Sequence, residues 1–382
     1  MKIAVNTRLL LKNKLEGIGQ FTFENLKRIT NNHPEHQFYF LFDRKFDESF
    51  IFSDNITPIV AYPQARHPYL WYLFFEYGIP FQLKKIKPDV FISTDGWIPT
   101  NLNIPSLNVI HDLNFLHYPE FIPSVVNRYY QRFFHKFATK ATRLATVSEF
   151  SKYDICRQYN INPDKIDVVY GGSNPLYMPL STIAQNAVKK EFTDNCDFFL
   201  FVGLIHKRKN LTNIFKAFES FKSRSNSLTK LVVVGNKKWW TGEIEDTYNS
   251  LSFKNDILMM GYQPTDIVVK LTASAKAVVY PSFFEGFGLP IVDAFNANVP
   301  VITSNVSSMP EIAGDAALLV NPFDYNSIAD AMYILNSDSS LRNNLITKGI
   351  ERKNLFTWDK TSNLLWNSIE NVLSQTITNQ LN

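Results

Sequence analysis

Short apolar runs alternate with longer segments of helical periodicity along the first half of the chain. Runs of this length are typical of buried strands, and the segments between them have the period of amphipathic helices. A regular alternation of strand and helix predicts an α/β fold with a doubly wound, mostly parallel sheet. The strands expected in this half are 3–5, 37–42, 56–61, 90–94, 106–110, 143–147 and 166–170.

The second half has the same rhythm without a close internal sequence repeat. Between the halves, the segment from Gly171 to Pro175 combines permissive glycines with a helix-breaking proline, so it is the best candidate for a hinge. The sequence predicts an N-terminal domain over 1–174, a C-terminal domain over 175–358, and an amphipathic helix with a polar tail over 359–382. The strands expected in the C-terminal domain are 197–202, 230–234, 257–260, 275–280 and 299–303, and helices are expected at 211–221 and 265–273.

Length and composition fit two globular domains. The 382 residues include 45% apolar and 19% charged residues, and the net charge of +4 gives no reason to expect nucleic acid as a partner. The two cysteines, Cys156 and Cys196, lack metal-ligand spacing, so neither a disulfide framework nor a zinc site is expected from them. The first ten residues have the pattern of a strand rather than of a signal peptide, and no apolar run approaches the ~18–20 residues of a membrane span. We expect a cytoplasmic protein that is at most peripheral to a membrane.

Two carboxylates mark a candidate site in the C-terminal domain. Glu285 lies beside Gly286 and Gly288 in a loop, where the absence of a Cβ lets backbone approach a ligand closely. A helix that begins near Leu289 would present free N–H groups, which favour phosphate. Asp293 follows eight positions after Glu285, so the two acids can hold different parts of one extended ligand. A general acid/base pair is the rival function, and an exposed loop acid beside a helix-capping aspartate is the structural alternative.

A second strand end in this domain gathers three cations. Lys207, Arg208 and Lys209 follow the strand at 197–202, and Asn210 is placed to cap the next helix. Such a cluster can hold a diphosphate, whereas a solvated basic turn is the structural alternative.

In the N-terminal domain, Gly17 and Gly19 form a turn between the first strand and the first helix. This arrangement can direct backbone N–H groups toward a ligand, although a tight turn with close helix packing explains the same glycines. Position 22 is Thr where a dinucleotide fingerprint requires Gly, which argues against NAD. His111 and Asp112 follow the strand at 106–110, and a structural role for this histidine stays open.

The stretch from Phe284 to Ala294, followed by 300–304 and 309–322, resembles the signature of retaining glycosyltransferase family 4, the glycosyl transferases group 1. That family normally has a second glutamate where this chain has Asp293, and some members have an arginine where Leu204 stands. The resemblance implies the GT-B fold, in which two Rossmann-like domains face each other across a cleft. It also implies that the last helix crosses back to the N-terminal domain.

The resemblance implies a nucleotide-sugar donor, such as a GDP- or UDP-sugar, in the C-terminal domain and a saccharide or lipid-linked acceptor in the N-terminal domain. Lys209 would contact the donor pyrophosphate, Glu285 the hydroxyls of a hexose-type donor sugar, and Asp293 the ribose. His111 would lie near the donor sugar. Transfer would retain the anomeric configuration and need neither metal ion nor cofactor. The remaining donor-binding residues implied are Gly17, Gly19, Arg208, Gly286, Phe287, Gly288 and Leu289.

Two aromatic stretches, 67–81 and 129–137, have three interpretations. Core packing comes first, and the second is a basic and aromatic face that touches a membrane surface or a lipid-linked acceptor. Stacking on single-stranded nucleic acid is the third, and nothing else in the sequence supports it. The family also implies surface polysaccharide synthesis. A GT-B sugar-nucleotide epimerase stays open as an alternative, as does a degenerate binding subunit, which Leu204 and Asp293 favour. The donor base and sugar, the acceptor and the oligomeric state stay open.

Overall fold

The computed structural model describes residues 1–12, 14–15, 17–236 and 240–381, with side chains up to residue 375 in the last helix. The chain divides into two compact units, the first formed by Met1–Gly172 with Thr357–Asn382 and the second by Ser173–Phe356. The division falls between Gly172 and Ser173, whereas the sequence placed it between Asn174 and Pro175. Among the described residues, none of the helices combines the length and the hydropathy that a membrane crossing requires.

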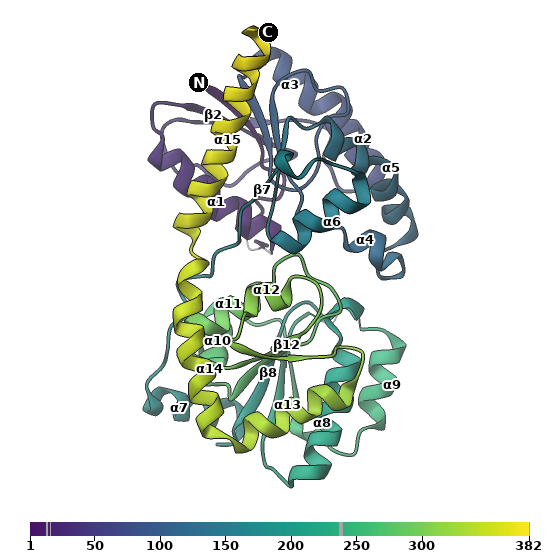
Figure 1. Ribbon diagram of the computed structural model, residues 1–382, viewed down its shortest axis with the longest axis vertical. Coiled ribbons are helices and arrows are strands. Elements are labelled where there is room, and N and C mark those ends of the chain that lie inside the picture. Colours follow the sequence, from purple (N-terminus) through teal and green to yellow (C-terminus); the bar gives the residue numbers. More distant parts are fainter. Residues whose placement is uncertain (13, 16, 237–239, 382) are drawn as a thin grey trace. The chain divides into compact units, whose positions relative to one another are not determined.

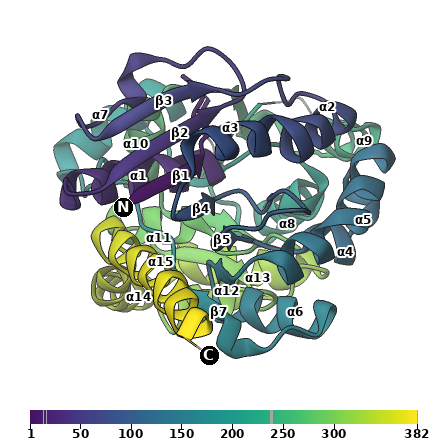
Figure 2. The same ribbon diagram turned by 90° about the horizontal axis from the view of Figure 1, so that it is seen from above.

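The described part of the first unit contains a sheet of seven parallel strands in the order β3-β2-β1-β4-β5-β6-β7. All seven expected strands are present, and three of them, 90–93, 106–109 and 143–146, have only buried residues. Figure 2 shows β3, β2 and β1 side by side at one edge of this sheet. The strands are β1 (Lys2–Asn6), β2 (Gln37–Phe42), β3 (Ile56–Val60), β4 (Val90–Ser93), β5 (Ser106–Val109), β6 (Arg143–Thr146) and β7 (Ile166–Val168).

Helices cover both faces of this sheet. The C-terminal helix α15 (Trp358–Leu381) packs against α1 (Ile18–Asn32), and Figure 1 shows both on one side with α2, α3 and α5 on the other. Ser148 caps α6 (Glu149–Tyr159) by accepting a hydrogen bond from the amide of Ser151. The other helices are α2 (Pro68–Leu73), α3 (Ile79–Ile86), α4 (Asn114–His117), α5 (Ser124–Lys140) and α6 (Glu149–Tyr159), with short turns at Glu48–Phe50, Phe74–Gly78, Pro119–Phe121 and Pro163–Lys165.

The aromatic stretches supply much of the core of this unit. Trp97 is buried, and its ring contacts Trp71 and Phe75 from the first stretch and Tyr129 and Phe134 from the second. Core packing is therefore confirmed for this part of both stretches. Other members are exposed: Tyr69, Tyr72, Tyr77 and Phe81.

The second unit holds a sheet of six parallel strands within its described residues, in the order β10-β9-β8-β11-β12-β13. The sequence analysis missed β13 (Ala317–Val320), whose inner two residues are only partly buried or exposed. The other strands are β8 (Phe198–Val202), β9 (Lys230–Val234), β10 (Ile257–Gly261), β11 (Ala277–Tyr280) and β12 (Val301–Ser304).

Figure 1 shows α8, α9 and α13 on one side of this sheet and α7, α10, α11 and α14 on the other, and the packed pairs of helices agree with this division. The helices are α7 (Thr182–Thr193), α8 (Leu211–Ser225), α9 (Gly242–Ser250), α10 (Thr265–Ser274), α11 (Leu289–Asn296), α12 (Met309–Ala313), α13 (Tyr325–Ser337) and α14 (Ser339–Arg352), with short turns at Lys207–Lys209, Lys254–Asp256 and Lys353–Leu355.

Each sheet has one point where the order of its strands reverses. In the first unit this point lies between β1 and β4, and in the second between β8 and β11. Ligands of open parallel sheets bind outside the carboxyl ends of the strands at such a point. The fold therefore singles out two places for a site, one in each unit.

Candidate functional site

The switch point of the second unit brings together the basic turn after β8 and the glycine loop after β11. Arg208 Nη1 lies 2.6 Å from Glu285 Oε2, and Lys209 Nζ lies 2.6 Å from Glu285 Oε1. The same Arg208 nitrogen donates to the carbonyl of Phe284 at 2.6 Å. Three of the residues proposed from sequence thus lie in one cluster, although 76 positions separate Lys209 from Glu285.

Glu285 is a buried anion. Only 7% of the residue is exposed, so its interpretation as an exposed loop acid is wrong. Burial opposes its ionisation, but Arg208 and Lys209 outweigh burial and lower the pKa of the carboxyl to about 2. At neutral pH the carboxylate can accept hydrogen bonds but has no proton to give.

Tyr280, the last residue of β11, also belongs to this cluster. Its hydroxyl donates to Glu285 Oε1 at 3.0 Å and contacts the ammonium of Lys209, which lies 4.7 Å from the centroid of the ring. Burial, with the nearby Glu285, raises the pKa of Tyr280 well above its usual range, so the phenol stays protonated. Sequence reasoning missed this residue; its signal was a hydroxyl that ends an otherwise apolar strand. We call Arg208, Lys209, Tyr280 and Glu285 the Glu285 cluster.

Two serines that the sequence analysis did not single out hold the glycine loop. Ser307 Oγ accepts from the amide of Glu285 at 3.1 Å, and Ser308 Oγ donates to the carbonyls of Glu285 at 2.9 Å and Phe287 at 3.1 Å. The Phe287 ring is buried and packs edge-on against Phe356. The loop is therefore fixed by its own polar contacts, and the side chain of Phe287 serves packing.

Gly288 needs to be glycine, because its φ of 104° lies in the left-handed region and a Cβ there would come within 3.0 Å of Ile291. The helix α11 begins at Leu289 as expected. However, Pro290 has no N–H, and the Ile291 amide donates to the Gly288 carbonyl at 3.0 Å. The helix start offers a phosphate fewer N–H groups than the sequence analysis assumed.

Asp293 lies inside α11, half-buried, and Oδ1 accepts a hydrogen bond from the amide of Asn174 at 3.2 Å. Burial raises the pKa of this carboxyl to about 7, against the opposing effect of that hydrogen bond. The two acids therefore differ in charge at neutral pH, since Glu285 is fully ionised while Asp293 is close to its midpoint.

Asn210 does not cap α8, which corrects the expectation from sequence. Its φ of 63° is left-handed and its side chain makes no capping bond. The amide instead donates to the carbonyls of Pro281 at 2.9 Å and Pro322 at 2.7 Å. Asn210 thus ties the basic turn to the loop that carries Glu285, and His206 caps the basic turn by accepting from the Arg208 amide.

The switch point of the first unit holds a charge pair that sequence reasoning did not find. Arg8 Nε donates to Asp95 Oδ2 at 2.6 Å, while Asn6 and Ser93 donate to Asp95 Oδ1 at 2.9 and 3.0 Å. The guanidinium carbon of Arg8 lies 4.6 Å from the centroid of the Trp97 ring. We call Asn6, Arg8, Ser93 and Asp95 the Asp95 cluster.

His111 follows β5 in the first unit and is pinned through one ring nitrogen. Its Nε2 lies 2.8 Å from the carbonyl of Thr94, which can only accept, so Nε2 carries the proton. Burial lowers the pKa of His111, and the ring is therefore neutral at pH 7 with Nδ1 as an acceptor. Such a ring can accept a hydrogen bond at Nδ1 and carries no positive charge at pH 7.

The glycine turn of the first unit fits close packing at one of its two glycines. A Cβ on Gly19 would lie 3.0 Å from the carbonyl of Leu9, whereas one on Gly17 would meet nothing within 4 Å. Gly17 has a φ of 36°, which explains a glycine there. Packing therefore accounts for Gly19, and a donor contact of either residue stays a prediction.

The residues at the Glu285 cluster are two cations, one anion, a phenol and glycine backbone. This set suits an anionic diphosphate better than a metal ion, which prefers several carboxylates or imidazoles. Two doubly wound units, with a cationic site at the switch point of the second, are the architecture of GT-B proteins.

Comparison with known families agrees with this architecture. Residues 17–175 match the family described as "Glycosyltransferase Family 4", and residues 183–352 match the family described as "Glycosyl transferases group 1". The chain therefore belongs to the family 4, group 1 glycosyltransferases of the GT-B fold.

Relatives and solved structures span nearly the whole chain. O-antigen chain mannosyltransferase B from Escherichia coli is 26% identical over 370 residues, which cover 94% of this chain and 97% of that protein. Sucrose-phosphate synthase from Thermosynechococcus elongatus superposes with a TM-score of 0.79 at 16% identity, covering 98% of this chain and 100% of that one. The structure of Anabaena HepE in complex with UDP and glucose superposes with a TM-score of 0.74 at 14% identity, and the match covers 97% of this chain and 99% of that one. These structural likenesses show the fold alone.

Proposed function

We propose that this glycosyltransferase is a retaining, metal-independent hexosyltransferase. It takes the sugar from a nucleoside-diphosphate sugar, with GDP- and UDP-sugars the first candidates, and transfers it to a saccharide or lipid-linked acceptor. The observation that carries the proposal is the Glu285 cluster, in which two cations surround one buried carboxylate at the switch point of the second unit.

The Glu285 cluster contains two cations and one anion, and it lies beside glycine backbone that can approach a ligand closely. Arg208 and Lys209 face Glu285, and the glycine loop follows directly in sequence. When the bond between the anomeric carbon and the phosphate oxygen breaks, negative charge develops on the diphosphate. A preorganised ammonium and guanidinium stabilise this charge without having to reorganise during the reaction. Lys209 and Arg208 would thus act on the leaving group.

Glu285 would hold the donor sugar rather than act as an acid. Its pKa of about 2 keeps it ionised, so it accepts hydrogen bonds from sugar hydroxyls. In the proposed step the acceptor hydroxyl oxygen bonds to the anomeric carbon, its proton passes to an oxygen of the departing phosphate, and the configuration is retained. The neutral His111 would accept a hydrogen bond from the sugar through Nδ1.

We further propose that the product is a surface polysaccharide. The support is the mannosyltransferase relative that acts in O-antigen chain synthesis in Escherichia coli, with coverage of nearly both full chains. Mannose is therefore the first sugar to test.

A peripheral contact with a membrane is part of the proposal. Tyr69, Tyr77 and Phe81 are 75%, 62% and 57% exposed on consecutive helical segments, and Lys84 and Lys85 follow on the same helix. Aromatic rings beside cations are the composition of surfaces that lie at a lipid headgroup layer. Co-sedimentation with vesicles containing anionic lipid should fall for the Tyr77→Ser/Phe81→Ser variant and not for Tyr262→Ser, an exposed aromatic of the second unit. Equal binding of all three proteins would remove this face from the proposal.

The first experiment is thermal unfolding with chelator present, against UDP, GDP, ADP, dTDP and NAD. A nucleotide at about 100 times its dissociation constant adds roughly 2.7 kcal/mol of stability, which appears as a rise in Tm. We expect one nucleoside diphosphate to stabilise the protein and NAD to have no effect. If none stabilises it, the donor-site proposal is replaced by the degenerate binding subunit. That alternative is favoured by the exposed Leu204 and by Asp293, whose side chain is one methylene shorter than the glutamate usual in the family.

The second experiment follows the product. With the stabilising nucleotide's mannose and glucose donors, a saccharide acceptor and chelator, NMR of the anomeric proton reports whether the new linkage keeps the donor configuration. An inverted linkage would refute retention, and activity only on addition of a divalent ion would refute metal independence. Turnover of the donor without any acceptor would favour the epimerase instead.

A further inference from the structure

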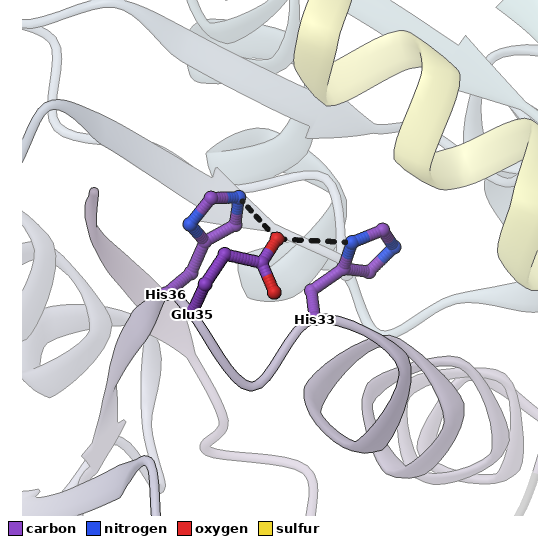
Figure 3. A group of neighbouring side chains, drawn as sticks. All are labelled: His33, Glu35 and His36. Carbon is purple, nitrogen blue, oxygen red and sulfur yellow. Dashed lines mark ion pairs between the residues drawn. The ribbon is translucent and has the colours of Figure 1, made fainter.

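The turn between α1 and β2 places two imidazoles around one carboxylate oxygen. His33 Nδ1 lies 3.6 Å from Glu35 Oε1, and His36 Nε2 lies 3.2 Å from the same oxygen. Figure 3 shows the carboxylate between the two rings. We propose that these three residues, the His-Glu-His turn, bind a divalent transition-metal ion such as Zn²⁺. The proposal is independent of the transfer reaction.

The spacing of the ligand atoms is that of a metal site. Zinc bonds to imidazole nitrogen and carboxylate oxygen are about 2.0–2.2 Å long, which puts two ligands of a tetrahedral ion about 3.3 Å apart. The two measured separations lie on either side of that value, and the ligand atoms of all three residues lie within 4.8 Å of one another. An ion pair with Glu35 needs one imidazole, whereas here a second ring nitrogen is directed at the same oxygen.

One side chain organises the backbone of this turn. The amide of Asn55 donates to the carbonyls of Thr30 at 3.1 Å, His33 at 3.1 Å and His36 at 3.0 Å. The amide of His36 also donates to the carbonyl of His33 at 3.2 Å. The turn is therefore fixed before a metal arrives, which reduces the ordering cost of binding.

The imidazole rings are oriented by a tryptophan of the C-terminal helix. The Trp366 ring stacks on His33 with centroids 3.6 Å apart and on His36 at 5.3 Å, and the two imidazoles are within 4° of parallel. The other nitrogen of His36, Nδ1, lies 3.4 Å from the α-amino group of Met1, so Nε2 is the one turned toward Glu35. Partners on the far side of metal-binding imidazoles are the usual means of fixing ring orientation.

The chemistry of the three ligands selects the ion. Two nitrogens and one carboxylate oxygen suit Zn²⁺, Co²⁺, Ni²⁺ or Cu²⁺, whereas Mg²⁺ and Ca²⁺ prefer oxygen ligands alone. The side chain of Glu35 is 58% exposed, which leaves access for a water molecule as the fourth ligand. A bound ion would be held by two imidazoles that stack on Trp366, the residue by which α15 contacts the α1–β2 turn.

The test uses the full chain without a histidine tag, freed of metal by a chelator and then dialysed. Calorimetric titration with ZnCl₂ should show one ion per chain and MgCl₂ none, and Co²⁺ should give the visible absorption of tetrahedral coordination. Glu35→Gln changes an exposed side chain and should keep the fold, yet weaken Zn²⁺ binding at least about tenfold. The matched control His135→Ala removes an exposed imidazole of α5 and should bind as the unchanged protein does.

Trp366 provides a second readout. Cu²⁺ at the site should quench tryptophan fluorescence, and Trp366→Phe should lose most of this quenching while it binds Zn²⁺ within about threefold of the unchanged protein. Zn²⁺ binding that Glu35→Gln and His33→Asn leave unchanged, or no binding at 100 times the protein concentration, would overturn the proposal. The turn would then be only a histidine–glutamate ion pair.

Discussion

The two sheets present a charged cluster at the same topological position, yet the clusters differ in balance. The Asp95 cluster pairs one arginine with one carboxylate, and Asn6 and Ser93 complete the contacts of the carboxylate. The Glu285 cluster sets two cations against one carboxylate and continues into a glycine loop. Both anions are 7% exposed, so burial does not distinguish them.

The difference indicates which unit has charge to offer a ligand. In the buried pair of Arg8 and Asp95, each charge is balanced by the other. The Trp97 ring also covers the guanidinium of Arg8. Two cations around one carboxylate, beside glycine backbone, give the Glu285 cluster a net positive charge that attracts a further anion. The comparison teaches that position in the fold creates a place for a site, while the charge balance decides whether it suits a diphosphate.

The largest expected effect comes from breaking the matched pair. Asp95→Asn leaves the guanidinium of Arg8, whose side chain is 11% exposed, without its anion. Loss of one partner of a buried pair lowers the free energy of unfolding by about 3–5 kcal/mol. Urea unfolding followed by tryptophan fluorescence measures this loss.

The control for Asp95→Asn is Asp330→Asn, which breaks the exposed pair with Arg224 and should cost at most about 1 kcal/mol. The Tm rise that a nucleoside diphosphate gives should stay unchanged in both variants. If Asp95→Asn abolished that rise in folded protein, the first unit would take part in diphosphate binding and the comparison would fail.

The next effect tests the Glu285 cluster. Lys209→Ala removes the ammonium beside Glu285 and should lower kcat by about 10²–10³-fold, since it stabilises charge that develops on the leaving group. Lys207→Ala is the matched control. Lys207 lies two positions before Lys209 in the sequence, and its ammonium pairs with the exposed Glu243 at 3.2 Å rather than with Glu285. Steady-state transfer rates decide, and an equal loss in both variants would contradict a specific role for Lys209.

Asp293 should make stability depend on pH. Its pKa of about 7 in the folded chain lies above the ordinary 3.8, so the folded state binds the proton more tightly than the unfolded state. The protonated Asp293 therefore contributes its full stabilisation below about pH 4. This contribution declines as the pH rises and is lost above about pH 7, where the buried carboxylate is charged. Between pH 5 and 8 the decline should be roughly 2–3 kcal/mol.

Asp293→Asn should flatten that part of the profile, as urea unfolding at several pH values would measure. A variant with the same slope as the unchanged protein would assign the pH dependence to other groups. Binding of the stabilising nucleotide should weaken in this variant if the carboxylate holds the ribose.

The smallest effect comes from adding a cation. Leu204 is 37% exposed after Gly203, where some family members are expected to have an arginine. Leu204→Arg should tighten nucleoside-diphosphate binding by up to about fivefold, because a partly exposed charge-assisted contact contributes about 1 kcal/mol. Calorimetry on the variant checks this, with Leu204→Gln as the uncharged control. Weaker binding would show that the space is already used by the ligand or by Arg208.

Local pattern was sufficient for all the described strands except β13. Buried strands such as β2 and β8 are continuous apolar runs, and a run of that kind needs no distant partner to be recognised. The glycines at 286 and 288 likewise marked the loop, since the left-handed backbone at Gly288 excludes a side chain. The fold class and the segments that carry the site therefore followed from the sequence.

The tertiary structure alone decided which of these groups meet. Asn210 had the position of a helix cap, but the order of the strands placed two proline carbonyls within its reach and drew its amide away. The same order brought Lys209 to Glu285 and Arg8 to Asp95, and the packing of α15 against α1 brought Trp366 to His33. The charge state of Asp293 depends on burial, which a carboxylate's place in the sequence does not reveal. Spacing along the chain determines elements, whereas contacts between distant residues, and the pKa values that they set, depend on how the sheet orders its strands.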